Sequence, residues 1–232
     1  MSEVRTAADR GNAAAQLNLG IMYDRGQGVP QDYKKAVRWY RLAADQGEPE
    51  AQFNLGRLYV AGLGVAQDFA EAVRWFRKAA DQGDAAAQFF LAGAYATGSG
   101  APQDYAEAVK WYRKAAEQGR ADAQWQLGAI YANGLGVAPD YADASRWYRK
   151  AADQGNTNAQ GDLGAMYAIG QGVPEDYVQA HMWLSLAASH AASSSDQKKY
   201  TSGRDLLATM MTPQQVAEAQ RLAREWKPMP AK

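Results

Sequence analysis

Two histidines and a set of Gly-x-Gly loops are the residues whose types and spacing could do chemistry. His181 and His190 lie nine residues apart, a separation that matches none of the short spacings between zinc ligands. We therefore expect both to be surface or cap residues rather than catalytic or metal-binding residues. Cysteine is absent, so the chain can form no disulfide, thiol nucleophile or thiolate metal site.

The loops that begin at Gly26 and Gly62 have the form Gly-x-Gly, and similar loops recur along the chain. None continues into the third glycine of a dinucleotide fingerprint or the Lys-Ser/Thr pair of a P-loop. Their repetition instead predicts turns with positive φ angles between helices. An aspartate follows each loop, where it favours the positive N-terminal end of the next helix; these are Asp32, Asp68, Asp104, Asp140 and Asp176. No catalytic constellation remains, so the sequence predicts no enzyme, cofactor or metal.

A repeated pattern must position these residues. Its most regular element is a tryptophan every 36 residues, at Trp39, Trp75, Trp111, Trp147 and Trp183. A fixed period of this size predicts an array in which each unit buries its apolar face against its neighbours. The predicted organisation is a truncated repeat tail at 1–10, five repeats at 11–46, 47–82, 83–118, 119–154 and 155–190, and a helical cap at 191–232.

Each repeat is predicted to form two helices. In the first copy, apolar spacing places one helix from about Asn12 to Asp24 and a second from about Asp32 to Gly47. The five tryptophans fall on the apolar stripe of the second helices and are predicted to be structural core residues. Gly20 recurs at one register inside the first helix, where glycine costs roughly 1 kcal/mol against alanine. We interpret this glycine as the sign of a close backbone approach between helices.

The cap is predicted to contain two further helices, which would cover the apolar end of the array. One is expected from an N-cap at Asp196 to about Met210. The last is expected from the capping-box sequence at Thr212 to about Trp226.

Composition excludes several classes of partner. Basic and acidic residues are equal at 25 each, which argues against broad electrostatic binding of nucleic acid or anionic lipid. No apolar run is long enough for a transmembrane helix.

The compartment stays open: the chain is cytoplasmic as written, or periplasmic or secreted if a leader was trimmed. The partial repeat at the start fits either a natural end or a trimmed longer chain, and it could mediate self-association.

The repeated pattern, Ala-x-x-x-Leu-Gly-x-x-Tyr followed by Gly-x-Gly-Val-x-x-Asp-Tyr-x-x-Ala-x-x-Trp-Tyr-x-x-Ala-Ala-x-Gln-Gly, resembles the Sel-1-like repeat family from about Ala7 to Ala188. The ending from Met211 to Trp226 also resembles the closing helix of bacterial members. The resemblance implies an all-α, right-handed α/α superhelical solenoid related to tetratricopeptide repeats, with first helices lining a concave surface. It implies adaptor work rather than catalysis. One branch of the family is rich in disulfides, and this chain departs from it.

Variable positions on the first helices are the candidate binding residues. Leu17, Phe53, Phe89 and Trp125 occupy one register on the side opposite the repeating face. Large apolar side chains in an exposed row are typical of interaction sites; the alternative is that they pack sideways between adjacent first helices. The predicted groove comprises Leu17, Asn18, Ile21, Phe53, Asn54, Arg57, Phe89, Phe90, Trp125 and Gln126.

These observations predict a non-enzymatic scaffold or adaptor that binds a segment of a partner protein in its concave groove. The alternative is a periplasmic protein that binds carbohydrate or assists polysaccharide export, in which the aromatic row would stack on sugar rings. The partner's identity and the oligomeric state stay open.

Overall fold

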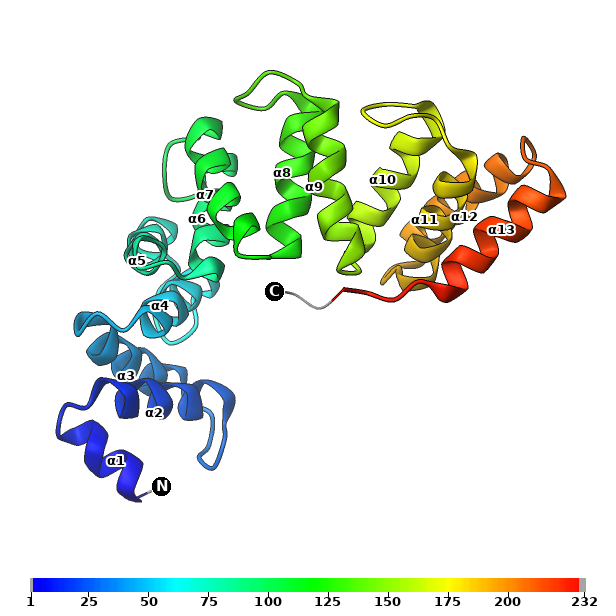
Figure 1. Ribbon diagram of the computed structural model, residues 1–232. Coiled ribbons are helices and arrows are strands. Elements are labelled where there is room, and N and C mark those ends of the chain that lie inside the picture. Colours follow the sequence, from blue (N-terminus) through cyan, green and yellow to red (C-terminus); the bar gives the residue numbers. More distant parts are fainter. Residues whose placement is uncertain (1, 230–232) are drawn as a thin grey trace. The chain divides into compact units, whose positions relative to one another are not determined.

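The computed structural model describes residues 2–229, which form thirteen helices and, over that range, no strand (Figure 1). The helices are α1 Ser2–Asp9, α2 Ala13–Arg25, α3 Tyr33–Asp45, α4 Pro49–Ala61, α5 Phe69–Asp81, α6 Ala85–Thr97, α7 Tyr105–Glu117, α8 Ala121–Asn133, α9 Tyr141–Asp153, α10 Thr157–Ile169, α11 Tyr177–His190, α12 Ser194–Ala208 and α13 Pro213–Glu225. They form two compact units, the first ending at Lys114 and the second beginning at Ala115.

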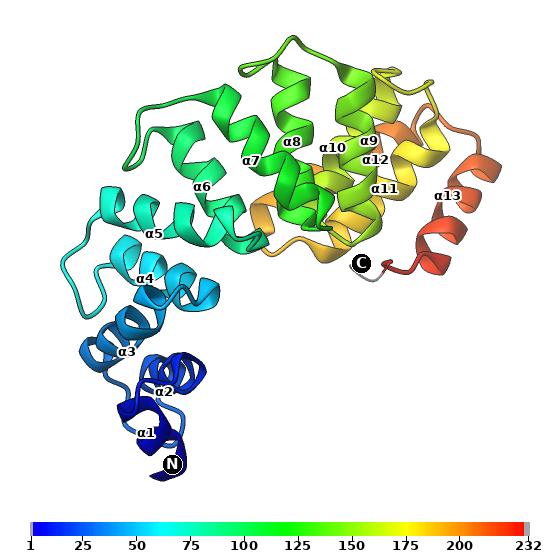
Figure 2. The ribbon, with the colours of Figure 1, turned by 60° about the vertical axis from the view of Figure 1, so that its left-hand side comes forward.

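The first unit stacks helix pairs, and Figure 2 shows α2 beside α3 and α4 beside α5. Asn12 is the N-cap of α2, because its side chain accepts a hydrogen bond from the backbone N–H of Ala15 at 2.8 Å. Gly26 and Gly28 adopt φ angles of 68° and 70°, which confirms the turn prediction. Asp32 Oδ1 also accepts from the backbone N–H of Lys35 at 3.0 Å, so the aspartates are direct N-caps as well as charges near the helix dipole.

The recurring helical glycine makes room for an aromatic ring of the second helix. A Cβ atom placed on Gly20 would lie 2.5 Å from the Tyr40 ring, and one on Gly56 would lie 2.7 Å from the Phe76 ring. The predicted close approach of backbones is therefore wrong in one respect, because the atoms nearest to these two glycines belong to an aromatic side chain. Because glycine lacks the methyl group of alanine, an aromatic ring can pack against the helix. This packing offsets the lower helix propensity of glycine.

The tryptophan ladder lies largely in the core. Trp39, Trp75, Trp111 and Trp183 are between 1% and 8% exposed. Trp147 is only half-buried, and the ammonium group of Lys150 lies 4.1 Å from its ring centroid. The ladder therefore supports both units, with one copy more open to solvent than the sequence pattern predicts.

A glutamine ladder joins successive helix pairs. Each buried glutamine donates from its amide nitrogen to a backbone carbonyl eight residues earlier, as Gln16 does to Ala8 at 3.1 Å. For Gln16, Gln52 and Gln124, the Oε1 atom accepts from the glutamine that follows the second helix of the same repeat, as Gln16 does from Gln46 at 2.7 Å. The buried members are Gln16, Gln52, Gln88, Gln124 and Gln160. These bonds satisfy polar groups that would otherwise be costly to bury.

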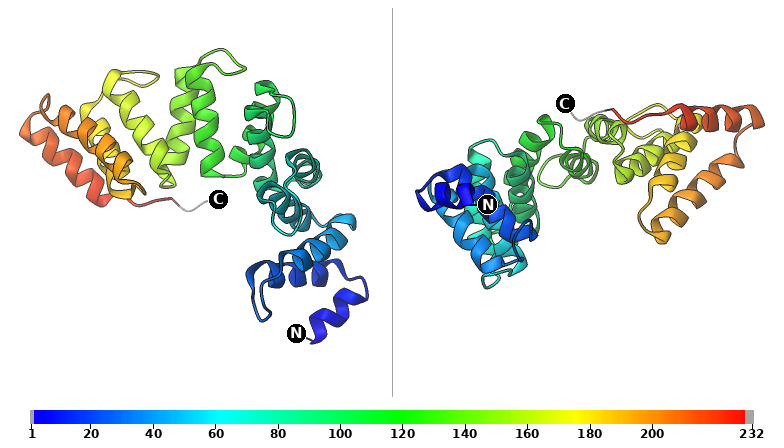
Figure 3. Two further views of the ribbon diagram at one scale, coloured as in Figure 1. Left: turned by 180° about the vertical axis from the view of Figure 1, so that it is seen from behind. Right: turned by 90° about the horizontal axis from the view of Figure 1, so that it is seen from below.

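The cap of the second unit has two helices that both pack against α11 and diverge from their connecting turn (Figure 3). Helix α12 begins earlier than predicted, because Ser193 rather than Asp196 is its N-cap and accepts from the backbone N–H of Asp196 at 3.0 Å. Helix α13 has the predicted capping box, in which Thr212 and Gln215 bond to each other's backbone N–H groups at 2.9 and 3.2 Å.

Candidate interaction surface

An exposed phenylalanine, held by three other rings, stands out on the first helices of the first unit. Phe90 on α6 is 40% exposed, and its ring centroid lies 5.6 Å from Phe53, 5.5 Å from Phe76 and 5.6 Å from Phe89. Phe76 is fully buried, whereas Phe53 and Phe89 are half-buried. We call Phe53, Phe89 and Phe90 the aromatic patch. Such centroid separations are favourable for aromatic pairs, so the patch is held in place before any partner binds.

The predicted row is not uniformly open. Leu17 is buried in a core cluster that includes Tyr40 and Leu55, and Ile21 packs half-buried against the same cluster. Phe53 approaches the second-helix ring of Phe76 at a centroid distance of 5.8 Å. The positions one residue later in each repeat are more exposed. At these positions Asn18 and Phe90 are exposed and Asn54 is half-buried. Sideways packing thus describes Leu17, while the aromatic patch combines packing with an open face.

Arg57 lies one helical turn from Phe53 and belongs to a buried polar network. It pairs with the carboxylate of Asp24, which also accepts a hydrogen bond from the Tyr40 hydroxyl at 3.1 Å. Burial raises the pKa of Tyr40 well above its usual range, and the negative charge of Asp24 is the next largest cause of this rise. The Arg57 side chain remains 40% exposed, so it fixes a positive charge near the patch. Asp24 is not among the groove residues predicted from the sequence; its signal is an acid where the other repeats carry Val60, Ala96, Ala132 and Ala168.

In the second unit the same row has a different environment. The Trp125 indole N–H donates to Asp162 Oδ2 at 2.8 Å, and both side chains are half-buried, as is Gln126. Burial raises the pKa of Asp162, and the Trp125 hydrogen bond and the Lys199 charge oppose that rise. Trp125 is therefore engaged through its polar edge rather than free to face a ligand with the whole ring.

The last position of the row is Gly161, and a side chain from the cap fills the space above it. Tyr200 on α12 is 5% exposed, and a Cβ atom on Gly161 would lie 2.2 Å from its Cε1 atom. Helix α12 thereby closes this end of the row.

One histidine lies elsewhere than expected. His181 is 3% exposed, so its predicted surface or cap position is wrong. It occupies the register of the buried Val37, Val73 and Val109, and α12 brings Arg204 and Asp205 near it. Burial lowers the pKa of His181. His190 is exposed and replaces the second glutamine of the ladder: its Nδ1 atom lies 3.4 Å from Gln160 Oε1.

Within residues 2–229, no group of three or more His, Asp or Glu side chains is arranged to hold a metal ion. Over the same range, no helix is both long and apolar enough to cross a membrane.

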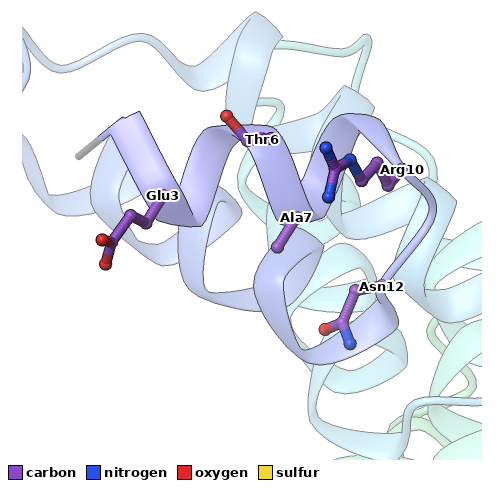
Figure 4. Close-up of a pocket in the computed structure, with 5 residues that line it drawn as sticks. All are labelled: Glu3, Thr6, Ala7, Arg10 and Asn12. Carbon is purple, nitrogen blue, oxygen red and sulfur yellow. The ribbon is translucent and has the colours of Figure 1, made fainter.

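A shallow hollow lies at the start of the first unit, where self-association is predicted. Figure 4 shows Glu3, Thr6 and Ala7 of α1, Arg10 just after it and the N-cap Asn12 of α2 around the hollow. It combines one acidic and one basic side chain with a capping amide already bonded to the backbone. Self-association at this hollow stays a prediction.

The pairs of helices, with their glycine turns, aspartate caps and tryptophan ladder, match one family. The model of the Sel1 repeat matches residues 13–48, 49–84, 85–119, 121–156 and 157–191. The chain belongs to the Sel1 repeat family. It is an all-α solenoid, and Sel1 repeat proteins generally serve as protein-interaction scaffolds. A comparison with curated proteins found no match.

Solved Sel1 repeat structures share this fold. A protective antigen of uropathogenic Escherichia coli strains, c5321, is 42% identical with a TM-score of 0.84 over 96% of this chain and 48% of that one. The chain thus spans about half the length of that relative. A Sel1 repeat protein from Oxalobacter formigenes is 39% identical with a TM-score of 0.77, over 94% and 89% of the two chains. A putative one from Klebsiella pneumoniae, at 24% identity and TM-score 0.53, matches in fold.

Proposed function

We propose that this Sel1 repeat protein is a non-enzymatic scaffold that binds an apolar segment of a partner protein on the aromatic patch. The observation that carries the proposal is Phe90. At its register the other four repeats carry polar side chains, namely Asn18, Asn54, Gln126 and Asp162. An aromatic ring that is 40% exposed at a position that is otherwise polar is costly in water unless something covers it.

The surroundings of Phe90 specify the chemistry of the partner. Three rings hold Phe90, so little side-chain entropy is lost when an apolar side chain packs on it. The exposed part of Arg57 lies on the same helix as Phe53 and offers a charge-assisted hydrogen bond to a carboxylate or carbonyl group. The expected partner segment therefore presents an apolar or aromatic side chain with an acidic residue or a free carbonyl nearby.

The first experiment is a peptide-display selection against the full chain, followed by affinity measurements on the selected peptides. Phe90→Asn introduces the residue type that the two preceding repeats carry, so the fold should persist, while binding should weaken at least about tenfold, as expected for an aromatic hot spot. Leu42→Asn is the matched control, because Leu42 is 39% exposed on the second helix α3. Peptides that bind Phe90→Asn as tightly as the parent chain would contradict the proposal.

Phe53→Ser and Phe89→Ser are less specific tests, because both side chains are half-buried and packed on other rings. Their loss would combine reduced binding with reduced stability. A glycan array provides the complementary measurement: sugar binding that Phe90→Asn abolishes, with no peptide selected, would favour the carbohydrate alternative.

A further inference from the structure

The segment after α13 returns to the body of the second unit, where it lies against the ends of earlier helices (Figure 1). The backbone N–H of Met229 donates to the carbonyl oxygen of Asp153, the last residue of α9, at 2.7 Å. This carbonyl is one of those at a helix C-terminus that lack an intrahelical partner. The tail is thus bound to the second unit by its backbone, a contact that does not depend on its side-chain sequence.

Two more contacts hold the same segment extended. Trp226 has φ −63° and ψ 139°, and its ring lies 6.3 Å from Trp183 and 6.0 Å from His190 between centroids. Pro228 passes Gly155, where an added Cβ atom would lie 3.8 Å from the proline Cβ and 3.7 Å from the Trp226 ring. An extended proline-containing segment loses little entropy when it binds, because its backbone is already restricted.

The tail reaches a hollow of the second unit, and Met229 is only partly enclosed there. Met229 lines this hollow together with residues from the ends of α7 and α9 and the start of α8, yet its side chain is 56% exposed. The small residues Ala116 and Gly119 also line it, as do the polar or charged residues Gln118, Gln124 and Lys150. The hollow has a volume of about 470 Å³, which leaves room for a longer or better-fitting segment.

We propose that the ends of α7 and α9 and the start of α8 form a second binding site, for an extended, proline-containing peptide with an apolar residue in the place of Met229. The chain's own segment Lys227–Met229 occupies the edge of this site as an intramolecular competitor. A partner peptide binds when it displaces that segment. This site lies entirely in the second unit and is independent of the aromatic patch.

The probe is a labelled synthetic peptide with the sequence of residues 226–232, titrated into the full chain and into its Met229→Asp variant. Aspartate at this position brings a negative charge toward Asp153 and Glu117, so the tail should leave the site. The peptide should bind the variant at least about tenfold more tightly than the parent chain. Amide chemical shifts of Glu117, Gly119 and Gln124 should move on binding and thereby locate the peptide.

A second peptide tests the backbone contact. Replacing the amide between Pro228 and Met229 with an ester removes the N–H donor and keeps the side chains, so affinity should fall about fivefold, the usual worth of one hydrogen bond. Equal affinity of the ester, equal binding to both chains, or no binding at millimolar concentration would overturn the proposal. A dimer of the parent chain that dissociates on Met229→Asp would also overturn it, because the tail would then occupy the site of a second copy.

Discussion

Trp125 and Asp162 join α8 to α10 through one hydrogen bond, the indole N–H donating to Oδ2 at 2.8 Å. Burial of the carboxylate raises the pKa of Asp162 above its ordinary value of 3.8, despite this bond and the nearby Lys199 charge. The folded state therefore binds the Asp162 proton more tightly than the unfolded state does. Stability contributed by this group is present below pH 3.8 and is lost as pH rises through the raised pKa.

Asp162→Asn should stabilise the protein at pH 7, because asparagine keeps an acceptor for Trp125 and removes the charge. The gain should shrink as pH falls below the ordinary aspartate pKa, where both side chains are neutral. Urea denaturation at pH 7 and pH 3.5 measures the difference. Asp81→Asn, at an exposed position, is the control and should change little. A destabilised Asp162→Asn at pH 7 would show that the charged form is favoured in the fold.

Gly56→Ala should destabilise the first unit by about 1–3 kcal/mol, the usual cost of overpacking. The new Cβ atom would lie 2.7 Å from the Phe76 ring and 3.2 Å from the Ala72 carbonyl oxygen, and this clash exceeds the gain in helix propensity. Gly93→Ala is the matched control, since its Cβ atom would meet only the Tyr112 hydroxyl at 3.5 Å. That variant should be stabilised by about 0.5–1 kcal/mol. Equal effects of the two substitutions in thermal or chemical denaturation would refute the packing argument.

Trp111→Ala should destabilise the protein by about 3–5 kcal/mol, because it removes a large buried side chain. Trp111 is 5% exposed, whereas Trp147, at the same register, is half-buried. Trp147→Ala should therefore cost at least about 1 kcal/mol less, since part of its surface already meets water. Denaturation midpoints of the two variants provide the comparison. If Trp147→Ala costs as much as Trp111→Ala, the exposure of the ladder does not control its contribution.

The helices could be read from the sequence because each signal is local. The glycine turns, the aspartate caps and the capping box at Thr212 depend on residues a few positions apart, so they repeat visibly in every copy. The burial of each ladder tryptophan likewise follows from the spacing of apolar residues within its own second helix. Four members of the ladder are buried, as that spacing predicts.

The candidate surface was harder to predict because exposure depends on contacts between helices. Leu17 and Phe90 both lie on first helices, yet one is buried and the other is 40% exposed. Rotation of a helix by one residue changes which side chain meets solvent, and a pattern of variable positions does not fix that rotation. His181 shows the same limit: it replaces a buried valine, and α12, which comes from outside the repeats, lies against it.

Tyr200 also comes from outside the repeats, and its ring fills the space above Gly161. Tyr200→Ala should destabilise the second unit by about 3 kcal/mol through the cavity it leaves. Tyr200→Phe should cost less than about 1 kcal/mol, because the hydroxyl donates only a long hydrogen bond, 3.4 Å to Asn158 Oδ1. Gly161→Ala should be costly in the parent chain, where the new Cβ atom would lie 2.2 Å from Tyr200 Cε1. In the Tyr200→Ala background the same substitution should cost nothing or stabilise the helix. A double-mutant cycle of denaturation free energies measures this coupling, and additive effects would show that Tyr200 does not pack on Gly161.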